Sequence, residues 1–494
     1  MINKKVLKKR KAGITLWITQ TAVTILFFCM LCSLNILELP YLLAAGAVLL
    51  LLDGYTVFTQ FSRKFHIPGK VIAFVLCIIL TTGSIYLYKT HKALDNVTGR
   101  EYQLDEVAVI VLAGSQAECL DDLGAGTFGI QSTVDRVNTD LVIGDINEKL
   151  KADIHIKIYD DVHLLVRGLY DGEVDAVIIN EAFREMIVEE YSDFNEATRV
   201  VDSYTKETEL NIPVREPVQA ANITEQPFLV YISGIDTFGE ISKTSRSDVN
   251  IIAAVNPVSK QILLVNTPRD YYVPLPVSDG LPDKLTHAGL YGVDCSLQTL
   301  EMLYDVDISY YMKVNFSGFK DIIDVLGGVT VHSDYNFRSH WGPSFVKGDN
   351  KVNGEQALAF ARERKSFPSG DIQRGKNQQY LIKAVFEKAV SPSVLTGYSS
   401  LIDSVSNSIK TNMPAEDITD LIKMQLKDMA SWNLVMIHVS GEGASKTTYS
   451  MPSRKTYVML PDSGKTDAAA RMISRVMEGQ KVTEEEYEQL SGKK

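Results

Sequence analysis

The stretch Ile251-Ile-Ala-Ala-Val-Asn-Pro-Val-Ser-Lys-Gln-Ile-Leu-Leu-Val265 contains two short apolar runs separated by a turn of Asn, Pro and Ser. Such runs are typical of buried strands joined by a tight connection. Phe228–Ile232 and Leu434–Val439 have the same character, and Gln378–Val390 has the period of an amphipathic helix. We therefore predict an α/β domain over residues 227–480, with helices on both faces of a central sheet.

A smaller domain is predicted before it. Strand and helix patterns alternate there, with strands at Val107–Leu112, Ile154–Ile158 and Ala176–Ile179 and helices at Ser132–Leu150 and Val162–Leu169. This rhythm predicts an accessory α/β domain over residues 91–215 without a cluster of catalytic residue types. A linker that contains Pro217 occupies 216–226, and the charged residues 481–494 are predicted to be a flexible tail.

Three apolar runs occupy the first 90 residues, at Leu16–Leu34, Leu39–Phe58 and Val71–Tyr88. Each is close to the roughly 20 residues that span a bilayer. Lys and Arg residues precede the first run, and Arg63, Lys64 and Lys70 lie between the second and third. The positive-inside rule then places the N-terminus in the cytoplasm and everything after about residue 90 outside.

The charge distribution excludes one class of partner. Residues 1–88 carry a net charge of +7, and because the whole chain carries −11, residues 89–494 carry −18. So acidic an outer region does not indicate nucleic-acid binding. Cys119 and Cys295 both lie outside, and their pairing stays open. Asp53 lies within the second run, either as a proton or partner site or as an acid near the headgroups.

Three arginines lie close together in Phe360-Ala-Arg-Glu-Arg364 and Gly370-Asp-Ile-Gln-Arg374. In a strand, Arg362 and Arg364 would point to the same side. In a helix, Arg374 and Gln378 would share a face. Guanidinium groups match phosphate oxygens in pairs and stay charged. We interpret the cluster as a phosphate-binding site, against the alternative that each arginine is a solvated surface residue.

Carboxylates and further arginines follow or precede the predicted strands. Asp236 follows the first strand of the large domain, Arg246 and Asp248 precede the second, and Arg269 follows the third. Mg²⁺ favours one or two carboxylates, with substrate phosphates completing its shell. We therefore predict Asp236 and Asp248 as metal ligands beside the arginines. Asp371, just before a helix, is most simply an N-cap.

The order of these motifs resembles the LytR–CpsA–Psr family over residues 227–395, extending to about 480. The resemblance is carried by Ile235-Asp236, Arg246-Ser-Asp248, Thr267-Pro-Arg-Asp270, Asp283-Lys-Leu-Thr-His-Ala-Gly289, Asp324-Val-Leu-Gly-Gly-Val329, Gln356–Arg364 and Gly370–Gln378. The three apolar runs and the accessory domain look like the capsule branch of that family. Lys284-Leu-Thr-His-Ala288 departs from the commoner Lys-Ile-Asn-Ala pattern, which leaves the roles of Thr286 and His287 open.

The resemblance implies an αβα sandwich with a mixed central sheet, and an enzyme of the cell membrane of a Gram-positive type bacterium. Such an enzyme moves a glycopolymer from a polyprenyl diphosphate carrier onto peptidoglycan through a phosphodiester, assisted by Mg²⁺ or Mn²⁺. Its implied partners are that lipid-linked polymer, peptidoglycan, the bilayer and other capsule-assembly membrane proteins. The positions matching the family's diphosphate site are Arg246, Arg269, Lys284, Arg362, Arg364, Asp371, Arg374 and Gln378; the metal positions are Asp236 and Asp248; the catalytic set is Asp236, Asp248, Arg269, Arg362 and Arg364.

Two other functions remain open on the sequence. One is a membrane sensor or regulator of polysaccharide synthesis, and the other is a polyprenyl-diphosphate phosphohydrolase that uses water as acceptor. The polymer itself stays open between a capsular polysaccharide, teichoic acid and another rhamnose-rich polymer. The general base is also open, because a metal-bound carboxylate is a poor base.

Overall fold

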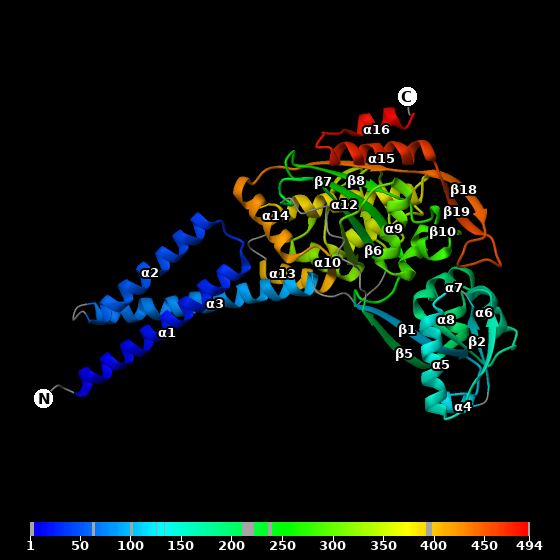
Figure 1. Cartoon of the computed structure of the whole chain (residues 1–494), viewed down its shortest axis with the longest axis horizontal. Coiled ribbons are helices and arrows are strands. Elements are labelled where there is room, and N and C mark those ends of the chain that lie inside the picture. Colours follow the sequence, from blue (N-terminus) through cyan, green and yellow to red (C-terminus); the bar gives the residue numbers. More distant parts are fainter. Residues whose placement is uncertain are drawn as a thin grey trace. The chain divides into compact units, whose positions relative to one another are not determined.

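The computed structural model describes residues 4–61, 65–98, 102–124, 126–132, 134–209, 222–235, 240–391 and 398–492. The chain divides into two compact units. The first contains residues 1–98, 394–406 and 413–430, and the second contains 99–393, 407–412 and 431–494. The accessory and large domains, which the sequence separates, thus belong to one compact unit (Figure 1).

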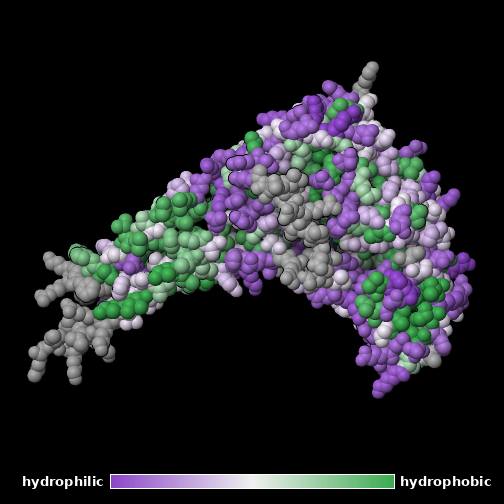
Figure 2. Space-filling view, in the orientation of Figure 1, coloured by the Kyte–Doolittle hydropathy of each residue, from purple (hydrophilic) through white to green (hydrophobic). Residues whose placement is uncertain are grey.

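The three predicted apolar runs form helices in the first unit: α1 (Lys4–Leu34), α2 (Leu39–Phe61) and α3 (His66–Thr98). Each is long and apolar enough to cross a membrane, and hydrophobic residues dominate their visible surface (Figure 2). Asp53 of α2 accepts hydrogen bonds from Trp17 Nε1 at 3.2 Å and Thr21 Oγ1 at 2.8 Å, both on α1. This acid therefore joins two helices, a use that the sequence did not indicate.

Two later helices belong to the same unit: α14 (Ala415–Asp428) entirely, and α13 (Tyr398–Ser408) up to residue 406. Lys89 pairs with Asp403 at 2.7 Å, and Lys427 pairs with Glu38 at 3.0 Å. Glu38 lies between the first two apolar runs and Lys89 follows the third, so alternating spans put both residues on one side of a membrane. Helices α13 and α14 hence pack against the end of the three apolar helices that carries Glu38 and Lys89.

The accessory domain is a five-stranded mixed sheet in the order β3-β2-β4-β1-β5. Its strands are β1 (Tyr102–Leu112), β2 (Thr127–Gln131), β3 (His155–Tyr159), β4 (Ala176–Asn180) and β5 (Thr198–Glu209), and its helices are α4 (Leu120–Leu123), α5 (Arg136–Leu150), α6 (Val162–Tyr170), α7 (Arg184–Glu190) and α8 (Phe194–Ala197). The sequence missed β2, which contains Gly129, and β5, whose side chains are largely polar. Buried apolar residues cover both faces of the sheet.

The large domain is built on a six-stranded mixed sheet in the order β16-β11-β6-β7-β8-β17. The strands are β6 (Phe228–Ile235), β7 (Ser247–Asn256), β8 (Gln261–Asn266), β11 (Tyr310–Asn315), β16 (Ile409–Thr411) and β17 (Asn433–His438). The pairs β6–β7 and β7–β8 are antiparallel, whereas β6–β11 and β8–β17 are parallel. The predicted mixed sheet is confirmed.

Helices cover this sheet on both faces. Residues of α9 (Val293–Tyr304) and α15 (Ser463–Met477) pack against one face, and residues of α12 (Asp371–Ala389) pack against the other. The domain also contains α10 (Phe316–Val325), α11 (Gly354–Arg362), α16 (Glu484–Leu490) and the strand pairs β9 (Tyr272–Pro274) with β10 (Pro282–Lys284), β12 (Val329–Ser333) with β15 (Gly348–Val352), β13 (Phe337–Arg338) with β14 (Ser344–Phe345), and β18 (Gly441–Lys446) with β19 (Thr456–Pro461). The architecture is the predicted αβα sandwich.

Several local predictions differ from the structure. The strand expected at Arg362 is wrong, because Arg362 is the last residue of α11. Asp371 is not the N-cap, since Gly370 takes that position with φ of 49°, and Asp371 is the first residue of α12. Glu484–Leu490, within the expected flexible tail, forms α16. Cys119 and Cys295 are both free, so they do not form a disulfide.

The loop between β18 and β19 fastens the accessory domain to the large domain. Its Met451 packs in the accessory core, and the Ser453 N–H donates to Asp161 Oδ2 at 2.9 Å. His287 Nδ1 lies 2.7 Å from Asp283 Oδ1 and 3.0 Å from Ser450 Oγ of this loop. His287, Asp283 and Ser450 are all buried, which gives His287 a structural role in holding the loop.

A buried acid in the accessory domain predicts a pH effect on stability. Asp135 accepts hydrogen bonds from Asn138 and Asn180, each at 2.7 Å, and Asn180 also donates to Asp105 at 2.9 Å. Burial raises the pKa of Asp135 to about 6, and the charge of Asp105 adds to this rise. Because the unfolded pKa is about 3.9, the folded state holds the proton more tightly.

We therefore expect the free energy of unfolding to fall by about 2 kcal/mol as pH rises from 4 to 6, and then to level off. Asp135→Asn should remove most of this fall, as measured by chemical denaturation of the detergent-solubilised chain at several pH values. Asp153→Asn, an exposed change in the same domain, serves as the control. An unchanged pH slope in Asp135→Asn would contradict the assignment.

Candidate active site

A cavity of about 590 Å³ lies between the large and accessory domains. The large domain contributes the predicted residues Arg246, Asp248, Arg269, Arg362, Arg364, Arg374 and Gln378, together with Phe316, Trp341 and Ala361. The accessory domain contributes Glu181, Arg184, Glu185, Val188, Glu189 and Asn195. Seven sequence-predicted residues from four separate segments therefore surround one space.

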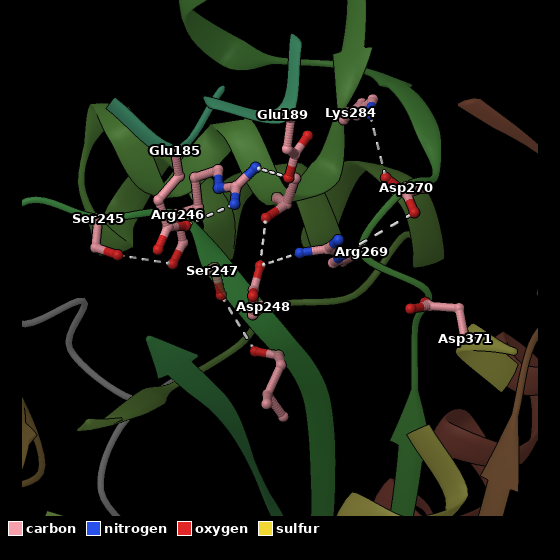
Figure 3. Close-up of polar contacts among 12 residues, drawn as sticks. Glu185, Glu189, Ser245, Arg246, Ser247, Asp248, Arg269, Asp270, Lys284 and Asp371 are labelled. Carbon is pink, nitrogen blue, oxygen red and sulfur yellow. Dashed lines mark hydrogen bonds and ion pairs between the residues drawn. The ribbon is translucent and has the colours of Figure 1, made fainter. Parts of the chain in front are cut away.

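Strand register brings the first of these residues together. In the antiparallel pair β7–β8, Ile251 lies opposite Asn266, and the Thr267 N–H donates to the Asn250 carbonyl at 2.9 Å. If the same register continues to the end of the two strands, Asp248 lies opposite Arg269. Arg269 Nη1 indeed donates to Asp248 Oδ1 at 2.9 Å (Figure 3). The central ion pair of the site thus follows from the pairing of two strands.

Asp248 is buried and ionised. Burial alone would raise its pKa, but Arg269, and after it Arg246 and Arg374, hold that pKa well below its usual range. Thr286 Oγ1 donates to the same carboxylate oxygen at 3.1 Å. The unusual Thr286 therefore has a definite position as a hydrogen-bond donor to the central acid.

The arginines around Asp248 retain unused donors. The Nε atoms of Arg246, Arg269 and Arg374 are buried without a hydrogen-bond partner in the described part of the chain. Arg374 and Gln378 both line the cavity, one helical turn apart on α12 as predicted. A buried donor without a partner costs about 1–3 kcal/mol. An anion with several oxygens is the ligand that would satisfy these groups.

Arg362 is held by aromatic side chains. Its guanidinium lies 5.2 Å from the centre of the Phe316 ring and 4.2 Å from that of Trp341. The neighbouring Glu363 accepts hydrogen bonds from His340 N at 2.6 Å and from Ser366 N at 3.0 Å. These contacts fix the loop that carries Trp341 and so limit the positions open to Arg362.

Two predicted site residues do not line the cavity. Lys284 pairs with Asp270 at 3.4 Å and does not line the cavity. Asp371 does not line it either, but pairs with Arg374 at 2.5 Å and so positions that arginine. Asp236 lies outside the described residues.

The sequence missed the accessory-domain side of the cavity. Arg246 donates to Glu189 at 2.8 Å and to Glu185 at 2.6 Å, both on α7 (Figure 3). Burial would raise the pKa of Glu189, but Arg246 outweighs it and holds that pKa below its ordinary value. The i,i+4 spacing of the two glutamates was the only local signal, and such pairs are common on solvated helices.

The described residues supply only part of a binding site for a divalent cation. They contain no group of three or more His, Cys, Asp or Glu side chains arranged to hold a metal. Asp248 uses Oδ1 for Arg269 and Thr286, which leaves Oδ2 for another ligand. One carboxylate oxygen beside a phosphate site suits Mg²⁺, which takes its remaining oxygens from phosphate and water.

Comparison with known proteins identifies the family of this chain. A family model described as the LytR_cpsA_psr family matches residues 186–465. The chain belongs to this family. A teichoic acid transferase of Bacillus cereus named TagU (polyisoprenyl-teichoic acid–peptidoglycan teichoic acid transferase) is 33% identical over 287 residues, which cover 58% of this chain and 90% of the relative. A Bacillus anthracis TagU is 34% identical over 283 residues, covering 57% and 88%.

Solved family structures are also similar. The crystal structure of B. subtilis TagU shares 29% identity with a TM-score of 0.41, covering 52% of this chain and 99% of that one. The match to each relative leaves a large part of this chain without a counterpart, while it includes nearly all of the relative.

A glycine beside the central acid gives a test of the site. Gly289 in the 3₁₀ segment Leu285–Tyr291 packs against the chain just before β7, where a Cβ would lie 2.6 Å from Ser247 N and 2.7 Å from Ser245 O. Gly289→Ala should push away the segment that carries Arg246 and Asp248. We expect a loss of about 1–3 kcal/mol in unfolding free energy and weaker pyrophosphate binding by calorimetry.

The matched control is Gly114→Ala, whose Cβ would meet no atom within 4 Å. If Gly289→Ala binds pyrophosphate as tightly as the wild type and is equally stable, the close packing described here is not what holds these residues in place.

Proposed function

We propose that this protein is a membrane-anchored transferase that moves a glycopolymer from a polyprenyl diphosphate carrier onto peptidoglycan. The observation that carries the proposal is the ring of arginines whose buried donors lack partners. Membership of a family in which relatives bear the name of such a transferase supports it. Among the residues that the structure describes, neither the sensor nor the hydrolase alternative has an observation of its own.

The proposed reaction uses these groups as follows. A peptidoglycan hydroxyl attacks the phosphorus that bears the sugar, forming a new O–P bond. The bond from that phosphorus to the bridging oxygen breaks, and polyprenyl phosphate leaves. Arg269, Arg362 and Arg374 neutralise the charge that develops on the phosphoryl oxygens. The hydroxyl proton passes to water or to the departing polyprenyl phosphate, because Asp248 is a poor acceptor while its pKa is held low.

Mg²⁺ or Mn²⁺ would be held by Asp248 Oδ2 together with Asp236, and would supply further neutralisation of the phosphates. The remaining residues bind and orient. Arg364 is exposed at the cavity, and in the described structure its guanidinium has no hydrogen bond or ion pair, so it is available to a phosphate. Gln378 offers an amide from the next helix.

The polymer is the finer part of the proposal. We favour a capsular polysaccharide because the three-helix anchor and the accessory domain resemble the capsule branch. Much of this chain lies beyond what the teichoic acid transferases match, which agrees with a different polymer. In this arrangement the N-terminus is cytoplasmic and the cavity lies outside, where lipid carrier and cell wall meet. Membrane anchoring would raise the effective concentration of the lipid-linked substrate.

An arginine substitution tests the proposed chemistry. With a polyprenyl-diphosphate-linked oligosaccharide, Mg²⁺ and a peptidoglycan fragment, Arg362→Ala should lower the rate of phosphodiester formation by about 10²-fold or more, since it removes a charge that stabilises the transition state. Radiolabelled product would be followed in detergent solution. Arg471→Ala, an exposed change on α15, is the control and should retain the wild-type rate.

The products separate the alternatives. Cleavage that proceeds equally without a peptidoglycan fragment would indicate a phosphohydrolase. A folded wild type that neither binds nor cleaves the lipid would indicate a sensor and would overturn the proposal.

Metal removal gives a second test. Chelation should abolish transfer, and added Mg²⁺ or Mn²⁺ should restore it, because the phosphates need neutralisation that the arginines do not complete. Asp248→Asn should need at least tenfold more Mg²⁺ for half-maximal rate. Full activity of the wild type after chelation would remove the metal from the mechanism.

A further inference from the structure

The cavity has two walls of opposite chemistry. The large-domain wall is dominated by arginines, whereas the accessory wall presents carboxylates and an amide from α7 and its neighbours. Glu185 and Glu189 are i,i+4 neighbours on α7, and Asn195 lies in α8. The polar atoms of this second wall include oxygens that accept hydrogen bonds, which a phosphate cannot use.

These acceptors are held in place by ion pairs. Glu189 uses Oε1 and Glu185 uses Oε2 to bind Arg246, so each keeps a second oxygen for another donor. The two side chains are 50% and 51% exposed, although Arg246 itself is buried. Arg184 pairs with Glu181 and donates to Asn195 Oδ1 at 2.9 Å, which fixes the amide and leaves its NH₂ group free to donate.

The accessory wall selects the kind of group that it accepts. Two carboxylates repel phosphate but accept hydrogen bonds from hydroxyl groups. Trp341, 54% exposed, adds an aromatic surface at the same cavity. The volume of about 590 Å³ falls in the range of roughly 300–1,000 Å³ that accommodates drug-sized ligands, so there is room beyond a diphosphate.

We propose that Glu185, Glu189 and Asn195 bind the sugar attached directly to the diphosphate, so that the accessory domain recognises the glycan while the large domain grips the phosphates. This inference rests on the proposed function, because a sugar is the hydroxyl-rich group that lies next to the diphosphate in that substrate. It assigns the sugar as neutral at this position, since a carboxylate or phosphate on it would face two acids.

Because both glutamates pair with Arg246, the loss of one carboxylate charge should affect a sugar-bearing diphosphate and a sugar-free diphosphate differently. Removing one carboxylate charge takes away an acceptor for the sugar, and it also releases a donor of Arg246 toward the phosphates. A sugar-free diphosphate should hence bind Glu189→Gln or Glu185→Gln as tightly as the wild type, or more tightly. If the two glutamates served only to dock the domains, their substitution would weaken the binding of both ligands together.

The experiment compares two probes on the full-length protein in lipid nanodiscs with Mg²⁺: a short-chain polyprenyl diphosphate, and the same lipid bearing one N-acetylhexosamine. Calorimetry gives Kd for each. We expect the wild type to prefer the sugar-bearing lipid. Glu189→Gln should lower this preference at least tenfold, the size of about one hydrogen bond to a charged group.

Two further variants complete the design. Asn195→Ala should lower the preference without touching Arg246, and Glu196→Gln is the control, an exposed acid beside Asn195 that does not line the cavity. Circular dichroism checks that each variant is folded.

If the glutamate variants bind both lipids equally more weakly, or bind both with unchanged Kd, the inference is overturned and α7 is only a docking element. A wild type that binds both lipids equally would also overturn it, while leaving the diphosphate site intact. If the wild type binds neither lipid, the proposed function itself fails.

Discussion

The ion pair between Asp248 and Arg269 is the interaction on which the site depends. Both side chains are buried, so each charge has lost its hydration and is compensated by the other and by neighbouring groups. Removing one partner of such a pair typically costs about 3–5 kcal/mol, because the other is left buried and unpaired. The pair therefore holds the beginning of β7 against the segment that follows β8. It also leaves the surrounding arginines in excess, which gives the large-domain wall of the cavity a positive charge.

The sequence predicted strands β6, β7, β8 and β17 of the central sheet, the αβα layers and the grouping of the arginines, because these depend on local periodicity and on the order of known motifs. Arg374 and Gln378 share a helical face as their spacing requires. Arg362 lines the cavity from the end of a helix and not from the predicted strand. Asn353 and Gln356 form a capping box that starts α11, and this helix ends at Arg362. A capping signal outweighed the strand alternation assumed for Arg362 and Arg364.

The contacts that the sequence could not reveal are the long-range ones. Glu185 and Glu189 meet Arg246 across about sixty positions of the chain, and no periodicity or spacing encodes that meeting. The same holds for Lys427, which pairs with Glu38 although the two residues lie near opposite ends of the sequence. The departure from the family pattern at His287 left its role open, and the structure shows that its partners Asp283 and Ser450 are buried and structural.

The division of the cavity between two domains has a chemical logic. A diphosphate is the same in every lipid carrier, so arginines that bind it can stay constant while the polymer changes. Discrimination among sugars requires hydrogen-bond acceptors placed for particular hydroxyls, since a site that loses such a bond leaves a buried group unpaired. Arg246 lies at the boundary, because it belongs to the large domain while both of its Nη groups are paired with glutamates of the accessory domain. A single guanidinium thus connects the part of the site that any family substrate would need with the part that only a particular glycan would need.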